Sequence, residues 1–175
     1  MSVLRNIVMI MGVIAALMVG GVGAASAQTQ VEPAAGAQAV VEEDAVDAAA
    51  ACPARLTAKM CKLYKAMLSK STSGKYKWDS IGCYRQDSLP YHPEGRACDL
   101  VYGKIGKKAT GDNLADGNKM KNWLVKNHAK YKLDHVIWQG RIYSARTNWS
   151  TSGRPQSCSG VTDCHRDHVH VAVQR

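Results

Sequence analysis

The stretch CHRDHVHVAV, residues 164–173, holds three of the six histidines of the chain and ends in alternating valines. This alternation predicts a strand over residues 168–173, because successive side chains of a strand point to opposite faces. His168 and His170 would then share one face with Ala172, while the valines fill the core from the other face. Two imidazoles on one face become a candidate metal site only if other ligands converge on them.

A second motif, YHPEGRACDL at residues 91–100, can supply those ligands. His92 and Asp99 stand seven positions apart, Gly95 permits a tight turn between them, and Ala97 takes little room. We therefore expect the chain to pass from a loop into a strand with imidazole and carboxylate close together. A His, an Asp and a distant His form a three-ligand zinc set with a fourth position open, which is typical of catalytic zinc.

The remaining apolar patterns predict an α+β domain. Residues 54–70 and 117–133 carry apolar side chains at helical spacing, although Asn127 interrupts the second pattern. Short β-type runs lie between and after these helices. We expect a small, mostly antiparallel sheet, covered by a few helices, stapled by disulfides and carrying the zinc site. The expected strands lie within residues 80–84, 98–102, 135–138, 141–143 and 168–173.

The first 50 residues are expected to lie outside this domain. Residues 1–27 have the layout of a secretory signal peptide, with Arg5, an apolar run over residues 7–22 and Ala25-Ser26-Ala27 before the cleavage point. The alternative is a retained membrane anchor, but the run is shorter than the ~20 residues that span a bilayer. Residues 28–50 are Ala-rich, contain five acidic and no basic residues, and are expected to be a disordered linker. Residues 51–175 are the predicted domain of a secreted protein with no stable membrane anchor.

All six cysteines fall within residues 51–175. An even number in an exported chain predicts three disulfides, which fifteen connectivities could satisfy. The alternative is ligation of zinc by two cysteine thiolates beside His165, which a reducing compartment would favour. Proximity in the sequence favours the pairs Cys52–Cys61, Cys83–Cys98 and Cys158–Cys164.

The predicted domain is strongly basic. It contains 22 of the 23 basic residues and nine of the 14 acidic residues, which gives a formal charge of +13. Such a charge favours polyanionic partners such as anionic cell-wall polymers, although it also suits a surface kept soluble by charge. A protein that bound DNA or another polymer through charge alone would leave the histidine motifs unexplained, and we expect no specific nucleic-acid partner.

Four motifs, taken in order, resemble a superfamily of zinc peptidases. It includes D-Ala-D-Ala carboxypeptidases, murein endopeptidases and the amino-terminal domain of Hedgehog proteins. The closer resemblance is to secreted, mostly actinobacterial domains of that superfamily, which read G-x-Y-R, H-x-x-G-R-A-x-D, I-W-x-x-R-I and D-H-V-H-V. This chain has GCYR at residues 82–85, HPEGRACD at 92–99, IWQGRIYS at 137–144 and DHVHV at 167–171.

The resemblance implies a zinc ion held by His92, Asp99 and His170. It also implies a peptidase in which zinc-activated water attacks a peptide bond. Pro90 departs from the pattern, because many relatives have Ser two residues before the first ligand. His128 and His135 lie outside these motifs and are expected in surface or turn positions.

The same resemblance implies roles for four further residues. His168 would donate to the developing oxyanion, and Asp167 would act as the base, in a place where relatives have Glu. His165 matches an additional active-site histidine of the endopeptidases, and Arg85 matches an arginine that binds a substrate carboxylate or the scissile carbonyl. Strict alternation would turn Asp167 away from His170 unless the strand begins, bends or bulges near it. Otherwise Asp167 would orient a histidine ring.

The sequence therefore predicts a secreted, monomeric zinc metallopeptidase that hydrolyses the peptides of cell-wall peptidoglycan. The alternative is a catalytically inactive module that keeps its zinc for stability and binds the cell wall or a protein.

Overall fold

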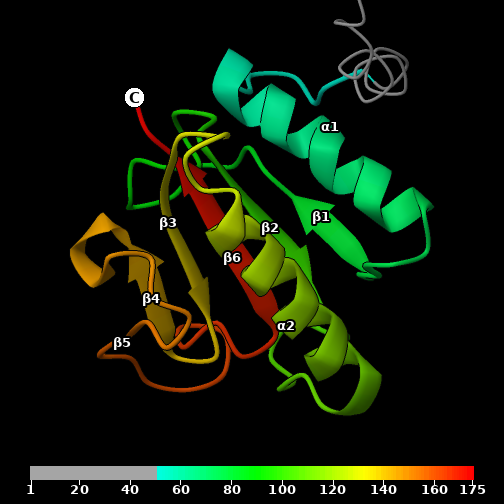
Figure 1. Cartoon of the computed structure of the whole chain (residues 1–175), viewed down its shortest axis with the longest axis vertical. Coiled ribbons are helices and arrows are strands. Elements are labelled where there is room, and N and C mark those ends of the chain that lie inside the picture. Colours follow the sequence, from blue (N-terminus) through cyan, green and yellow to red (C-terminus); the bar gives the residue numbers. More distant parts are fainter. Residues whose placement is uncertain (1–50) are drawn as a thin grey trace, which may run out of the picture. The chain divides into compact units, whose positions relative to one another are not determined.

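The computed structural model describes residues 51–175 as an α+β domain (Figure 1), in agreement with the fold class predicted from the sequence. The predicted signal peptide and linker lie outside the described residues. The elements are α1 (Ala58–Thr72), β1 (Ser80–Gly82), β2 (Ala97–Val101), α2 (Gly111–Lys126), β3 (Leu133–Trp138), β4 (Arg141–Ser144), the 3-10 helix η1 (Ala145–Thr147), β5 (Arg154–Pro155) and β6 (His168–Val173).

The six strands form one antiparallel sheet in the order β1-β2-β6-β3-β4-β5. The histidine-rich β6 lies in the middle of the sheet, paired with β2 on one side and β3 on the other. Every residue of β6 is buried. The alternation predicted for residues 168–173 is therefore the pattern of a central strand with one apolar and one polar face.

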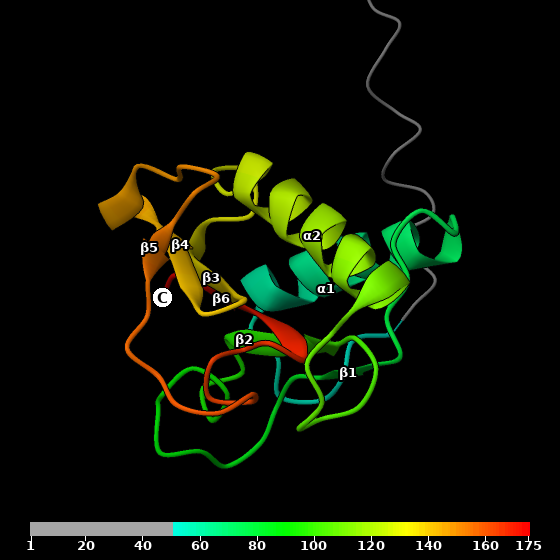
Figure 2. The same cartoon turned by 90° about the horizontal axis from the view of Figure 1, so that it is seen from below.

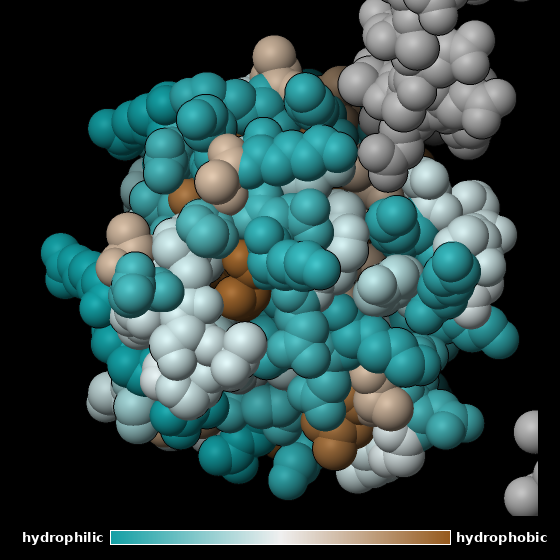
Figure 3. Space-filling model, in the orientation of Figure 1, coloured by the Kyte–Doolittle hydropathy of each residue, from teal (hydrophilic) through white to brown (hydrophobic). Residues whose placement is uncertain are grey.

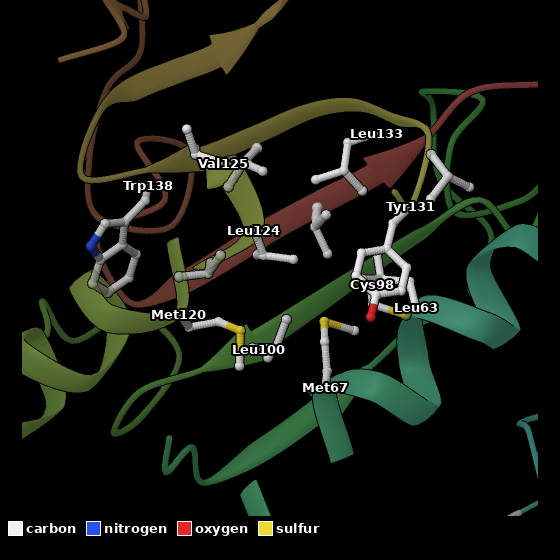
Figure 4. Close-up of a cluster of buried hydrophobic side chains, with 14 of the residues drawn as sticks. Leu63, Met67, Cys98, Leu100, Met120, Leu124, Val125, Tyr131, Leu133 and Trp138 are labelled. Atoms are coloured by element: carbon white, nitrogen blue, oxygen red, sulfur yellow. The ribbon is translucent and has the colours of Figure 1, made fainter. Parts of the chain in front are cut away.

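Both helices cover the same face of the sheet, and their apolar side chains form the core with the valines of β6 (Figures 1 and 4). Leu63 and Met67 of α1 and Leu124 of α2 are fully buried in this layer. At Gly117 an added Cβ would lie 2.3 Å from the indole of Trp138, so α2 packs directly on β3. This close packing fixes the position of α2 relative to β3.

The helix boundaries differ from those predicted. α1 begins at Ala58 because the hydroxyl of Thr57 accepts a hydrogen bond from the Met60 backbone N–H and caps the helix. α2 begins at Gly111, earlier than expected, and ends at Lys126. Asn127, expected within the helix, ends it instead, since its side-chain amide donates to the Trp123 carbonyl.

Long loops cover the other face of the sheet (Figure 2): residues 83–96 between β1 and β2, and residues 156–167 between β5 and β6. The disulfides favoured by proximity are all present, and no cysteine is free. Cys83–Cys98 ties the first loop to β2, and Cys158–Cys164 closes the second. The three disulfides indicate an oxidising, extracellular type of environment. Within residues 51–175, no helix has the length and apolar character that crossing a membrane requires.

Candidate metal centre

The loop-covered face of the sheet carries a polar cluster on its central strands. Cross-strand pairing places Asp99 of β2 opposite His170 of β6, and His170 opposite Ile137 of β3. One pair further along, Ala172 stands opposite both Ala97 and His135. Because residues two apart share a face, all these side chains lie on the face turned away from the helices. The small Ala97, as the sequence predicts, leaves room beside the cluster.

His92 reaches the cluster from the loop between β1 and β2. Its Nδ1 donates to the Cys83 carbonyl at 2.5 Å, so the lone pair of the neutral ring lies on Nε2. This nitrogen is buried, makes no hydrogen bond, and lies 3.3 Å from Oδ2 of Asp99. A nitrogen lone pair thus faces a carboxylate oxygen. Two acceptors at this distance repel each other unless a cation lies between them.

His170 completes the group, with its Nδ1 at 2.8 Å from Oδ1 of Asp99. One ligand atom from each of His92, Asp99 and His170 lies within 4.8 Å of the others, and all three residues are buried. Burial alone would raise the pKa of Asp99, but the hydrogen bond with His170 and the proximity of the His92 ring outweigh it and hold this pKa well below its usual value. Burial lowers the pKa of His170 and favours the neutral, metal-binding form.

The donor set fits a zinc ion. Two imidazoles and one carboxylate are ligand types that zinc accepts, and three protein ligands leave a coordination position for a reactant. The unpartnered Nε2 of His92 is the observation from this structure that calls for a cation. The His92–Asp99–His170 group predicted from the sequence could therefore hold a metal ion.

Arg85 lies at the edge of the group. Its Nη1 donates to Oδ2 of Asp99 at 2.5 Å and its Nη2 to Asp87 at 3.1 Å. The side chain is 48% exposed, so the guanidinium is also open to solvent. Arg85 thus borders both the His92–Asp99–His170 group, called the metal group below, and the space above it.

His168 and Asp167 form a couple beside the metal group. Nδ1 of His168 lies 2.7 Å from Oδ1 of Asp167, and its Nε2 lies 3.8 Å from Asp99. Asp167 is fully buried, and its other oxygen accepts from the Gly106 N–H and the Thr162 hydroxyl, each at 2.7 Å. Burial raises the pKa of Asp167, but these three hydrogen bonds outweigh it and keep the pKa low. The carboxylate thus lies behind His168, in the position of a group that orients this ring.

His165 also reaches the cluster, because β6 begins at His168 and strict alternation does not extend to earlier residues. Its ring centroid lies 4.6 Å from that of His168 and 5.5 Å from that of His170. Its Nδ1 pairs with the Asp163 carbonyl at 2.9 Å. Burial and the neighbouring histidines lower its pKa to about 4, so the ring is neutral at pH 7.

The expected surface position of His135 is wrong. This residue is 6% exposed, and its ring stacks on that of His170 with centroids 5.2 Å apart. Nδ1 of His135 lies 2.7 Å from Asp134, and the Tyr91 ring meets His135 edge-on. The sequence does contain a signal for the face of this side chain. Val136 and Trp138 are apolar and alternate with Ile137 and His135, so alternation places His135 on the polar face of β3. The pairing of β3 with β6, which brings this face to His170, is not encoded in the local sequence.

These residues line a cleft with a volume of about 730 Å³. Such a volume suits a ligand of several residues or a small molecule. The cleft extends from the β1–β2 loop to the far end of the sheet. Its polar lining includes Arg85, His92, His135, His165, His168 and His170.

Comparison with known proteins identifies a family. Residues 52–166 match the model of the family described as VldE, C-terminal domain, which is more than half of the 175 residues. The chain therefore belongs to this family. No curated protein and no solved structure matches the chain.

Proposed function

We propose that this protein is a secreted, zinc-dependent peptidase that hydrolyses peptide bonds of cell-wall peptidoglycan. The observation that supports the proposal best is the buried Nε2 of His92, whose lone pair faces Asp99 with no hydrogen-bond partner. This arrangement lies in a cleft large enough for a peptide. His92, Asp99 and His170 would hold the metal, and bound zinc would activate a water molecule and polarise the scissile carbonyl.

Arg85 would bind the substrate beside the metal group. Its guanidinium carries five N–H donors in a planar fork and is partly exposed at the cleft. From this position it can donate hydrogen bonds to a substrate carboxylate or to the oxygen that gains negative charge as the peptide bond is attacked. Asp87 and Asp99 hold the guanidinium at this edge of the cleft.

His168 would accept and return the proton at Nε2. With its Nδ1 proton donated to Asp167, the ring presents an Nε2 lone pair on the side of Asp99. The buried carboxylate would stabilise the imidazolium formed when His168 accepts a proton, and the imidazolium can then donate to the oxyanion or the leaving amine. Asp167 is thus a positioning residue in this proposal and acts through His168.

His165 would be a second, neutral imidazole beside the reacting bond. Its Nδ1 is engaged by the Asp163 carbonyl, so Nε2 carries the lone pair. A ring with a pKa of about 4 is a weak base, but it can accept a hydrogen bond from a peptide N–H without competing for the proton. This role orients the substrate while His168 moves the proton.

The second candidate is a catalytically inactive module that keeps zinc for stability and binds the cell wall or another protein. The burial of Asp167 favours it, because the carboxylate expected to act as the base makes no direct contact with the metal group. In either case the partners would be peptidoglycan peptides or an anionic polymer of the wall, at a location outside the cell.

Metal analysis combined with digestion of purified peptidoglycan tests the proposal. The zinc-loaded protein should bind one zinc and release new amino groups, and a chelator should stop the release. His170→Ala should bind no zinc, whereas His128→Ala should keep zinc and activity, since His128 stacks on Trp149 away from the cleft. Equal zinc contents in the two variants would rule out the ligand assignment. Zinc binding without release of amines over long incubation would support the inactive module.

A further inference from the structure

The metal group lies in a row of side chains that crosses the sheet. Asp99 pairs with His170, His170 with Ile137, Ile137 with Ile142 of β4, and Ile142 with Arg154 of β5. All five side chains therefore stand at one level of the same face. With neighbouring strands about 4.8 Å apart, Arg154 lies three strand spacings, or about 14 Å, from His170.

Two arginines at this end of the row lack partners. Arg146 of η1 and Arg154 both line the cleft and are exposed. Among residues 51–175, no acidic side chain pairs with either guanidinium and no hydrogen bond engages it. The acidic residues of the cleft are already engaged: Asp87 by Arg85, Asp134 by His135, and Asp163 by the Ser159 N–H.

The segment that carries Arg154 is held in place by its neighbours. Arg141 of β4 donates to the carbonyls of Ser152 and Gly153. The Gln156 N–H donates to the Gly140 carbonyl at 2.9 Å, which secures the chain on the other side of Arg154. The Arg154 guanidinium therefore projects from a fixed backbone, which lowers the entropy cost of binding a ligand there.

The path between the metal group and these arginines suits a peptide. Ile137 and Ile142 form an apolar floor, and both line the cleft. The side-chain oxygen of Gln156 is buried beside this path and accepts no hydrogen bond. A backbone N–H of an extended ligand would satisfy it, because an unpaired buried acceptor gains most from a new donor.

We propose that Arg146 and Arg154 form a carboxylate-binding subsite for an extended acidic peptide that runs across the strands from the metal group. This proposal rests on the proposed function in one respect: the peptide bound by the subsite would also be the substrate cleaved at the metal group. An extended chain advances about 3.3 Å per residue, so a span of about 14 Å places the recognised carboxylate about four residues from the bond at the metal group. The cleft therefore favours cleavage within a peptide over removal of one terminal residue.

Binding to the zinc-depleted protein tests the subsite apart from metal and turnover. The probes are two heptapeptides blocked at both ends, identical except that one has a single Glu where the other has Gln. The Glu peptide should bind at least about tenfold more tightly, since a charge-assisted hydrogen bond contributes that much. Arg154→Gln and Arg146→Gln should each remove most of this preference. Arg166→Gln changes the charge equally at an exposed arginine outside the cleft lining, and it should keep the preference.

Equal affinities for the two peptides, or an equal loss in Arg154→Gln and Arg166→Gln, would overturn the subsite. The spacing is tested with zinc-loaded protein and peptides that end in a metal-binding hydroxamate, with the Glu placed one to six residues away. Affinity should peak near four residues, and a flat series with intact hydroxamate binding would overturn the proposed path. If the hydroxamate itself contributes nothing, the zinc-peptidase proposal fails, while the comparison of Glu and Gln peptides still decides the subsite.

Discussion

At the scale of single residues, the site is organised by the partner of each imidazole nitrogen. An oxygen that engages Nδ1 of a neutral histidine leaves the lone pair on Nε2. His170 differs from the other rings because its Nδ1 faces Asp99 inside the metal group. In the remaining rings an oxygen outside the metal group engages Nδ1. These pairs are His92 with the Cys83 carbonyl, His135 with Asp134, His165 with the Asp163 carbonyl and His168 with Asp167.

The couple of Asp167 and His168 leads to the first prediction. Asp167→Asn should keep zinc but lower the hydrolysis rate by about 10²–10⁴-fold, because an amide can hold His168 in the wrong tautomer and cannot stabilise its cation. Thr162→Val removes one donor to Asp167 and should cost about tenfold. Asp163→Asn is the matched control, since its side chain bonds only the Ser159 N–H. Rates over a range of pH with zinc content measured in parallel check this, and an unchanged rate in Asp167→Asn would remove Asp167 from the mechanism.

The low pKa of His135 leads to a second prediction, on stability. This pKa is about 4 in the folded protein, chiefly because of burial and then the charge of His170, against 6.5 in an unfolded chain. Below pH 6.5 the unfolded chain binds the extra proton, so the stabilising contribution is complete above that pH and is lost as the pH falls to about 4. The loss should be about 3 kcal/mol for this group.

Urea unfolding of the protein in the presence of a chelator, at pH 7 and at lower pH, measures this effect. His135→Phe keeps an aromatic ring against His170 but cannot be protonated, so its free energy of unfolding should fall less between pH 6.5 and 4. His165, whose pKa is also about 4, contributes in the same direction, and the double variant with His165→Phe should fall least. Parallel curves for the wild type and the double variant would contradict the prediction.

At the scale of elements, one glycine just before β2 positions the loop that carries His92. Gly95 has φ of +65°, and a Cβ there would lie 1.8 Å from the Arg55 carbonyl oxygen. Its own carbonyl accepts from the Thr57 N–H at 3.0 Å, at the start of α1. Gly95 therefore joins the helix layer to the loop that carries His92, and its absent side chain is what permits the contact.

Gly95→Ala should accordingly destabilise the protein by about 3 kcal/mol or more and weaken zinc binding, because the segment around Arg55 must move. Gly74→Ala is the control: Gly74 has φ of +70° but open space around it, so it should cost only the left-handed strain of about 1 kcal/mol. Chemical unfolding and zinc titration of both variants measure the difference. Equal losses of stability would mean that the left-handed backbone conformation, and not the contact with Arg55, explains why a glycine is needed at position 95.

The strands differ in how far a local sequence pattern determines them. Alternation of polar and apolar residues predicts β6 and its two faces, because successive side chains along one strand point to opposite faces. His135 was misplaced because its approach to His170 depends on the pairing of β3 with β6, which no local pattern encodes. The early end of α2 was missed because Asn127 fits either an interrupted helix face or a cap. Arg154 stands at the far end of the cross-strand row that begins at Asp99. This position likewise depends on the order of all the strands and cannot be predicted from a local pattern.

At the scale of the whole molecule, charge is concentrated in one segment. Residues 51–78, which include α1, contain seven basic residues and no acidic residue. Lys59 and Lys62 are exposed on α1, on the side of the molecule opposite the cleft. Figure 3 shows the helix-covered face, which is mostly hydrophilic. We expect this face to meet anionic polymers while the cleft stays open.

Retention on isolated cell walls should therefore fall as ionic strength rises, because exposed charges are screened over about 10 Å at 0.1 M salt. Replacing Lys59 and Lys62 with Glu should weaken retention about tenfold or more. Replacing Lys107 and Lys108 with Glu gives the same change in net charge at an exposed loop and should weaken it less. Equal losses would indicate that net charge alone matters, and retention that is constant with salt would indicate a shaped pocket.

The shortness of the two outer strands has a consequence for behaviour at high concentration. β1 has three residues and β5 only two, one of which is Pro155. A sheet whose borders are this brief, with a proline on one of them, offers few free backbone groups to which a strand from another molecule could add. The central β6, rich in valine and otherwise prone to form fibrils, is enclosed between β2 and β3. The fold thus resists amyloid-like stacking even where the protein accumulates.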